Sequence, residues 1–208
     1  YAKAWETAGG GALLRLGSHP IGAMLQLKEE EGLRLHGQPT RVTAVTASTA
    51  DLSRTQGLTD ANTRIATGWK DVENWGMAVL HFADGARGIV YGSDNCLGGM
   101  QSRLELSSSN AQYLCNLSPN DLLKSYATEA ASFGNEYIME KVETHAGWNT
   151  PIPDEDWSSG QLGMCQAFVA DLQQGRAPLA GGQLGVEVMR VLAAAYESAR
   201  KERTVHLA

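Results

Sequence analysis

The stretch Val79-Leu80-His81-Phe82-Ala83-Asp84-Gly85-Ala86-Arg87-Gly88 decides the fold, because it predicts a β-hairpin near the middle of the chain. Its Asp-Gly pair supplies the positive φ angles that a tight turn at 83–86 requires. Residues 72–82 and 86–93 are the two predicted strands on either side of this turn. Strands joined by so short a connection run antiparallel, so the stretch indicates a largely antiparallel sheet.

Further strands are predicted on both sides of this hairpin. Residues 42–49 are rich in valine and threonine and alternate in character, which favours a strand with one exposed face. Residues 50–70 are polar and irregular and are predicted to form a long loop, a feature that is usually functional or contacts a neighbour. The remaining predicted strands are 103–107, 112–117 and 204–207, while 122–127 and 137–142 stay open as strands or irregular segments.

Helical spacing marks both ends of the chain. Residues 11–31 place Leu14, Ile21 and Leu25 on one apolar stripe. Two further stripes lie near the C-terminus. The first contains Leu162, Cys165, Phe168 and Leu172, and its helix is expected to be capped by Ser158 or Ser159 and to end at Gly175. The second contains Leu184, Val188, Val191, Leu192, Ala195 and Ala199. This element order predicts an α+β fold, an open, mostly antiparallel sheet with helices packed on one face. The other face of such a sheet is an association surface.

Composition narrows the class of protein. The 208 residues are 43% hydrophobic and 19% charged, which is typical of a globular chain. The net charge of −6 and the lack of a Lys/Arg cluster argue against nucleic acid as a partner. No apolar run reaches the roughly 18 residues of a membrane span. The three cysteines Cys96, Cys115 and Cys165 lack metal or disulfide spacing, so we expect buried, reduced thiols in a cytoplasmic protein without a metal site.

One arginine and one histidine stand out in the apolar segment that follows Gly9-Gly10-Gly11. If this segment is helical, Arg15 and His19 lie on one face about a turn apart. Pro20 leaves two interpretations open. It kinks a continuous helix, or it lies in the first turn of a second helical segment.

Two segments of the chain resemble one protein family. The first is Gly9-Gly10-Gly11-Ala12-Leu13-Leu14-x-Leu16-Gly17-x-His19-Pro20-Ile21, and the hairpin stretch quoted above resembles the family's central hairpin. The second runs from Gln166-Ala167-Phe168 through Gly175-Arg176-x-Pro178 and Gly185 to Ala194-Ala195-Tyr196-x-Ser198-Ala199 and ends at Val205-x-Leu207. These motifs resemble the Gfo/Idh/MocA oxidoreductases. The resemblance covers nearly the whole chain, but only the family's C-terminal, substrate-binding and oligomerising domain.

The resemblance implies a two-domain enzyme of which residues 1–208 form a single substrate-binding and oligomerisation domain. In that family an N-terminal Rossmann domain binds NAD or NADP and supplies a lysine from a Glu-Lys-Pro motif, and we find neither in this chain. Gly9-Gly10-Gly11 lacks the full Gly-x-Gly-x-x-Gly pattern and follows no hydrophobic strand. We therefore expect it to open a helix, and we expect no cofactor for this chain alone.

Family members carry Asp-x-x-x-His after the glycines, and the histidine takes the proton from a sugar hydroxyl as hydride leaves for the nicotinamide. His19 matches this histidine and is the predicted catalytic residue, with Arg15 and His19 as predicted substrate contacts. Arg15 replaces the aspartate and Gly22 a later acidic position, so those two roles do not carry over. Arg15 either binds an anionic group of the substrate or pairs with a nearby carboxylate or faces solvent.

Several charged and aromatic residues near the predicted loop stay secondary candidates. Asp60, Asp71 and Glu73 flank the loop, and solvated loop charges are the default interpretation. Tryptophans such as Trp69 and Trp75 offer faces for sugar stacking, although packing in the core or at an interface is the commoner role.

Three functions stay open. The first is the substrate and assembly domain of an NAD(P)-dependent oxidoreductase that acts on a sugar or polyol-like substrate and forms a homo-oligomer through the open sheet face. The second is a relative that uses transient oxidation for glycoside cleavage. The third is a non-catalytic binding or scaffold module whose site is eroded at Arg15 and Gly22.

Overall fold

The computed structural model describes residues 3–55, 57, 65, 67–97, 100–116, 125–133, 146–149, 156 and 159–207. The chain divides into two compact units. The first contains residues 1–97 and 180–208, and the second contains residues 98–179.

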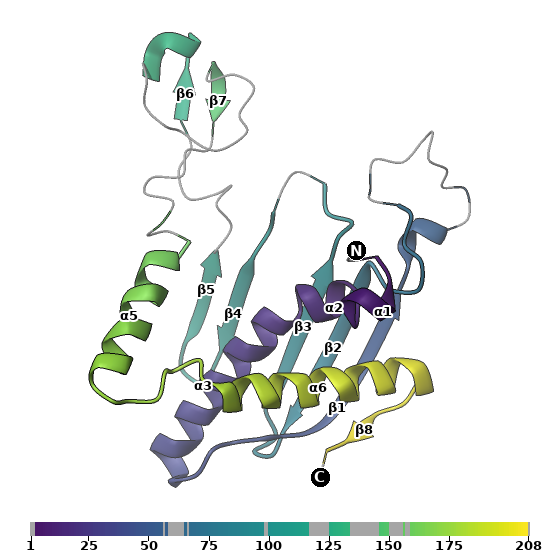
Figure 1. Cartoon of the computed structure of the whole chain (residues 1–208), viewed down its shortest axis with the longest axis vertical. Helices are drawn as coiled ribbons and strands as arrows, with labels where there is room; N and C mark the ends of the chain where they lie inside the picture. Colours follow the sequence, from purple (N-terminus) through teal and green to yellow (C-terminus); the bar gives the residue numbers. More distant parts are fainter. Residues whose placement is uncertain are drawn as a thin grey trace. The chain divides into compact units, whose positions relative to one another are not determined.

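The first unit is built on a four-stranded antiparallel sheet (Figure 1). Its strands are β1 (Val42–Ala50), β2 (Trp75–Phe82), β3 (Arg87–Ser93) and β8 (Val205–His206), and their order is β3-β2-β1-β8. The predicted hairpin is confirmed: β2 pairs with β3, and Gly85 adopts a φ of 91° in the turn between them. The α+β class and the open antiparallel sheet are likewise confirmed.

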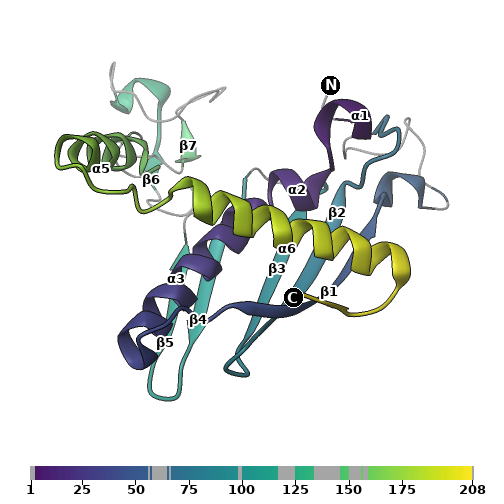
Figure 2. The same cartoon turned by 60° about the horizontal axis from the view of Figure 1, so that its bottom comes forward.

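Three helices cover one face of this sheet, as Figure 2 shows for α2 (Ala12–Arg15), α3 (Ser18–His36) and α6 (Gly182–Lys201). A short helix α1 (Trp5–Ala8) precedes them. The core lies between the helices and the sheet and contains, among others, Leu13, Ile21, Val45, Leu80, Val90 and Leu192. Burial follows the strand period, since β3 alternates exposed and buried residues.

Pro20 lies in the first turn of α3, which decides between the two interpretations of the sequence. A proline is tolerated there because the first N–H groups of a helix have no intrahelical partner. Leu16 and Gly17 separate α2 from α3, and the Gly17 N–H reaches back to the Ala12 carbonyl at 3.2 Å. The helix extends beyond the predicted end to His36, because Gly37 supplies the left-handed C-cap with a φ of 71°.

The opposite face of the sheet carries large apolar side chains. Ile89 is 66% exposed and Tyr91 54% exposed on β3, and Met77 is exposed beside them on β2. Trp75 packs edge-on against Tyr91, with ring centroids 6.2 Å apart. Among the described residues of the first unit, these apolar side chains therefore stay exposed on the face opposite the helices.

The second unit contains two small antiparallel ladders and one helix. β4 (Arg103–Ser107) pairs with β5 (Gln112–Asn116), β6 (Ser125–Ala127) pairs with β7 (Gly147–Asn149), and α5 spans Gln161–Gln173. Of the two segments that the sequence left open, the described end of 122–127 is the strand β6, whereas 137–142 lies outside the described residues. β7 was not predicted. The N-cap of α5 is Gly160, with a φ of 78°, and not the expected Ser159, while Ser158 lies outside the described residues.

The burial of the three thiols differs from expectation. Cys96, Cys115 and Cys165 are free, but all three are exposed, so the prediction of buried thiols is wrong. Cys96 lies in the turn after β3, whereas Cys115 and Cys165 lie on β5 and α5, two elements with no buried residue.

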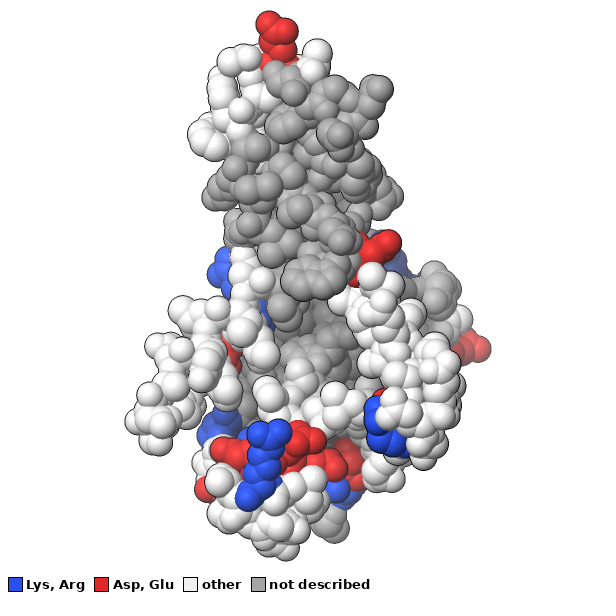
Figure 3. Space-filling view, turned by 90° about the vertical axis from the view of Figure 1, so that its left-hand side faces the viewer, with Lys and Arg blue, Asp and Glu red and all other residues white. Residues whose placement is uncertain are grey.

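The surface charges and the hydropathy of the helices agree with the predictions from the composition. On the face in Figure 3, acidic and basic side chains lie beside one another, and neither sign forms a separate patch. The α3 pair Arg34–Glu30, at 3.7 Å, is an example of such mixing. None of the helices in the described ranges is long and apolar enough to cross a membrane.

Candidate functional site

The glycine run begins the site by allowing close contact at the N-terminus of α2. Gly11 is the N-cap residue, and a Cβ atom there would lie 1.8 Å from the Glu73 carbonyl oxygen. A Cβ atom on Gly10 would lie 2.3 Å from the Tyr196 hydroxyl. The space that a pyrophosphate would need beside these glycines is thus filled by Glu73 and Tyr196. The prediction that the run opens a helix is confirmed, and the run does not fit a dinucleotide.

Glu73 caps α2 from the loop that precedes β2. Its side chain accepts hydrogen bonds from the backbone N–H groups of Gly11 (3.0 Å) and Leu13 (2.9 Å). A carboxylate is favourable at this position, because a helix N-terminus has unpaired N–H groups and a positive dipole end. Glu73 is only 8% exposed, so for this residue the default interpretation of a solvated loop charge is wrong.

Tyr196 joins α6 to the same helix end. Its hydroxyl donates to Glu73 Oε1 at 2.8 Å and accepts from the backbone N–H groups of Gly11 (3.3 Å) and Leu14 (3.2 Å). Burial, together with the adjacent Glu73 charge and hydrogen bond, raises the pKa of Tyr196 well above its ordinary value. The phenol therefore stays protonated and acts as a fixed donor and acceptor between α6 and α2.

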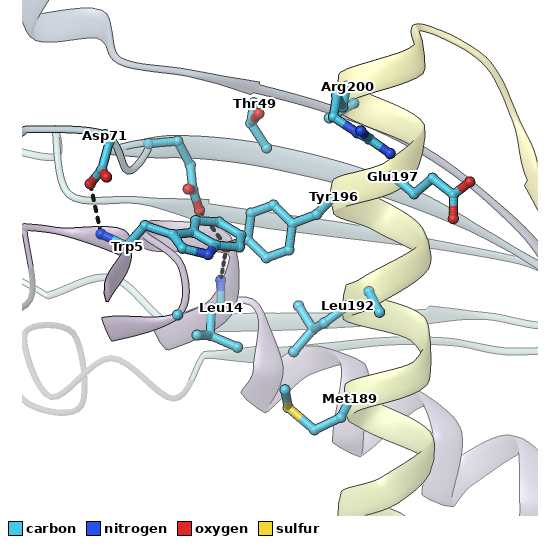
Figure 4. A pocket seen from close by; sticks show the side chains of 13 residues that line it. Trp5, Leu14, Thr49, Asp71, Met189, Leu192, Tyr196, Glu197 and Arg200 are labelled. Atoms are coloured by element: carbon cyan, nitrogen blue, oxygen red, sulfur yellow. Dashed lines mark hydrogen bonds between the residues drawn. The ribbon is translucent and has the colours of Figure 1, made fainter. Parts of the chain in front are cut away.

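A depression of about 610 Å³ lies beside this contact, between α1, α2 and α6 (Figure 4). Trp5 stands edge-on to Tyr196, with ring centroids 5.1 Å apart, and the Trp5 backbone N–H donates to Asp71 at 2.6 Å. Other lining residues include Leu14, Thr49, Met189, Leu192, Glu197 and Arg200. Neither Arg15 nor His19 lines this depression.

Arg15 forms an ion pair with Asp94, the residue that follows β3. This contact matches the second of the two sequence alternatives, pairing with a nearby carboxylate. The guanidinium also lies over the Trp69 ring, 5.8 Å from its centroid, and Lys3 Nζ lies 5.2 Å from the same centroid. Trp69 is buried beneath these two cations, so its ring does not offer an open face for sugar stacking.

Asn74 fixes the position of the Asp94 backbone. Asn74 is fully buried, and its carbonyl oxygen accepts the Asp94 N–H at 2.9 Å. Its side chain donates to Asp51 at 2.8 Å and accepts from Asn95 at 2.9 Å. A buried polar group with this many partners is rigid, so the ends of β1, β2 and β3 hold Asp94 in place.

His19 lies exposed in the first turn of α3, four residues beyond Arg15. The two residues belong to consecutive helical segments, and no hydrogen bond or ion pair involves His19 within the described part of the chain. An exposed imidazole at a helix start is accessible to a ligand. Its predicted catalytic role and the predicted substrate contacts of Arg15 and His19 stay predictions.

Two residues of this site were missed by the sequence analysis. Asp94 is 79 residues from Arg15 in the chain, and its only sequence signal is its place directly after a predicted strand. Tyr196 lies inside the quoted Ala194-Ala195-Tyr196 motif, where its hydroxyl gave no indication of the contact with Glu73.

Comparison with known proteins identifies a family. A family described as the GFO/IDH/MocA C-terminal domain matches residues 2–113. No curated protein matches the chain.

Solved structures extend the likeness over the whole chain. GenD2 from gentamicin A biosynthesis, in complex with NAD, is 26% identical with a TM-score of 0.73, and the match covers 100% of this chain and 51% of GenD2. An oxidoreductase domain protein from Kribbella flavida is 18% identical (TM-score 0.62, covering 100% and 54%). Myo-inositol 2-dehydrogenase from Lactobacillus plantarum is 16% identical (TM-score 0.61, covering 97% and 49%). The chain thus spans about half the length of these structures.

Proposed function

Because the chain belongs to the family of GFO/IDH/MocA C-terminal domains, we propose that it is the substrate-binding and oligomerisation domain of an NAD- or NADP-dependent oxidoreductase. The observation that carries this proposal is the match to GenD2, which covers the whole of this chain and whose structure contains NAD. The proposed substrate is a sugar or polyol. It is supported by the ion pair of Arg15 and Asp94 and by the exposed imidazole of His19 at the start of α3.

The nucleotide is proposed to bind outside this chain. The glycine run is occupied by Glu73 and Tyr196, so it leaves no cradle for a pyrophosphate. When bound, the nicotinamide ring supplies the redox chemistry. The residues of this chain contribute substrate binding, orientation and proton transfer.

His19 is the proposed proton acceptor for a substrate hydroxyl. The imidazole side chain has a ring nitrogen that can accept a proton from a hydroxyl group, the usual role of a general base. His19 lies exposed in the first turn of α3, four residues after Arg15 at the end of α2. We also propose a cytoplasmic location, in which the three exposed thiols stay reduced.

The open face of the sheet is the proposed oligomer interface. Met77, Ile89 and Tyr91 form an exposed apolar group on adjacent strands. Covering such a group removes apolar surface from water and stabilises the assembly.

The full-length protein tests the proposed function. We expect it to reduce NAD or NADP with myo-inositol or an aldose, because this chain shares its fold with about half of a myo-inositol 2-dehydrogenase and of an aldose-aldose oxidoreductase. His19→Asn should lower kcat by about 10²–10⁴-fold, the usual contribution of a general base. His36→Asn, an exposed histidine on the same helix, is the matched control and should leave kcat unchanged. No turnover with a panel of sugars and polyols, despite nucleotide binding, would instead support a non-catalytic binding module.

A further inference from the structure

The Arg15–Asp94 pair has hydrogen-bonding capacity that its own contacts do not use. Arg15 carries five N–H donors, and its Nη2 pairs with Asp94 Oδ2. Arg15 Nε is buried and has no hydrogen-bond partner within the described ranges. The side chains of Arg15 and Asp94 are 32% and 19% exposed, so both reach the surface. A partly exposed donor group and acceptor group thus lie side by side.

The pair is also held in place before any ligand arrives. The guanidinium lies over Trp69, and Asp94 is fixed through its backbone bond to the buried Asn74. Next to Asp94, the buried Asn95 Oδ1 likewise has no partner among the residues that the structure describes. Buried polar atoms without partners are rare in folded proteins, and a functional role is one of the explanations for them. Groups that are already ordered lose little entropy when a ligand binds.

The charges of the pair determine which ligand fits. Asp94 compensates the charge of Arg15, so a carboxylate or phosphate that approaches Arg15 meets the like charge of Asp94. An ammonium group that approaches Asp94 is likewise repelled by the positive charge of Arg15. Lys3, the other cation at Trp69, is engaged by the Thr67 carbonyl. A hydroxyl group suits both partners, because it accepts from the guanidinium and donates to the carboxylate.

We propose that Asp94 is a substrate-binding residue, and that Arg15 and Asp94 together bind two neighbouring hydroxyl groups of an uncharged sugar or polyol. This inference rests on the proposed function for its substrate class. Arg15 alone suggested an anionic substrate, whereas the Arg15–Asp94 pair favours an uncharged one.

Nitrogen-15 NMR titration of the 208-residue chain tests the inference without redox chemistry. The probes are myo-inositol, D-glucuronate and D-glucosamine, and the reporters are the Arg15 Nε–H and the Asp94 backbone N–H. Myo-inositol should shift both signals in a saturable way and bind more tightly than either charged probe. Asp94→Asn should weaken this binding by about tenfold or more, because hydroxyl recognition depends on a matched acceptor.

Asp171→Asn is the matched control. Asp171 pairs with Arg176 at 2.7 Å and its side chain is 16% exposed, much like Asp94. This variant should lose as much ion pairing as Asp94→Asn while binding myo-inositol like the unaltered chain. The inference is wrong if glucuronate binds best, if Asp94→Asn binds myo-inositol normally, or if no probe shifts the two reporters. Binding without turnover in the full-length protein would overturn the proposed function and leave the inference standing.

Discussion

At the scale of single residues, Gly11 is a position that leaves no space for any other amino acid. Its Cα lies against the backbone of Glu73, a contact that any side chain would block. The glycine is therefore required by close approach of two backbone segments and not by a bound phosphate. Gly76 and Gly92 serve a similar purpose: they are cross-strand partners on β2 and β3, and they allow α2 to lie directly on the sheet.

We expect Gly11→Ala to lower the free energy of unfolding by about 3 kcal/mol, because the new Cβ atom overpacks against a backbone oxygen. Gly185→Ala is the control. Gly185 lies exposed within α6 with open space around it, so this exchange should raise stability by about 0.5–1 kcal/mol. Urea unfolding followed by circular dichroism measures both. Equal stability of the two variants would contradict the packing explanation.

At the scale of elements, the contact between α2 and α6 depends on one phenol. Tyr196 satisfies backbone groups of α2 and shares a hydrogen bond with the buried Glu73. The ionised form of the phenol is unfavourable there, since burial and the Glu73 charge both oppose it. Stability that depends on the neutral phenol is thus sensitive to alkaline pH.

We expect the advantage of the natural chain over Tyr196→Phe to be about 1–2 kcal/mol at neutral pH, where the hydroxyl makes its bonds. Because the folded pKa is raised above 10.0, this advantage is fully present below pH 10.0 and is lost as the pH rises through the raised folded value. Thermal unfolding from neutral pH to about pH 11 measures the difference. The exposed Tyr91→Phe is the control, and a pH-independent difference for Tyr196→Phe would contradict the assignment.

The elements show how far sequence reasoning reaches. The β2–β3 hairpin follows from a local signal, Asp84-Gly85 in the turn. The ends of α3 were not predicted in the same way, because the expected helix ended at residue 31, before the Gly37 cap, and Pro20 left its start open. Local signals do not predict the pairing of Arg15 with Asp94 or the burial of Glu73. Each of these contacts forms between elements that are far apart in the sequence. The pattern of the glycine run predicted a helix start, but it did not predict that Glu73 and Tyr196 pack against the run.

At the scale of the whole molecule, the open sheet face is the proposed oligomer interface. We expect the chain to form an oligomer at micromolar concentration, and Ile89→Lys to shift it towards the monomer, because a charge on the apolar face opposes burial. Leu35→Lys, an equally exposed position on α3, should leave the oligomer intact. Light scattering after size-exclusion chromatography measures the mass. A monomeric natural chain would contradict the proposed interface.

The Gly11–Glu73–Tyr196 contact has a consequence for how the protein is made. Tyr196 lies 185 residues from Gly11 and 123 residues from Glu73 along the chain. Contacts so distant in sequence form late and slow folding, since most of the chain must be ordered before they close. A ribosome that has synthesised residues 1–180 has not yet supplied the hydroxyl that fixes α2. The segment with Arg15 and His19 is therefore expected to reach its final position only after the end of α6 has emerged.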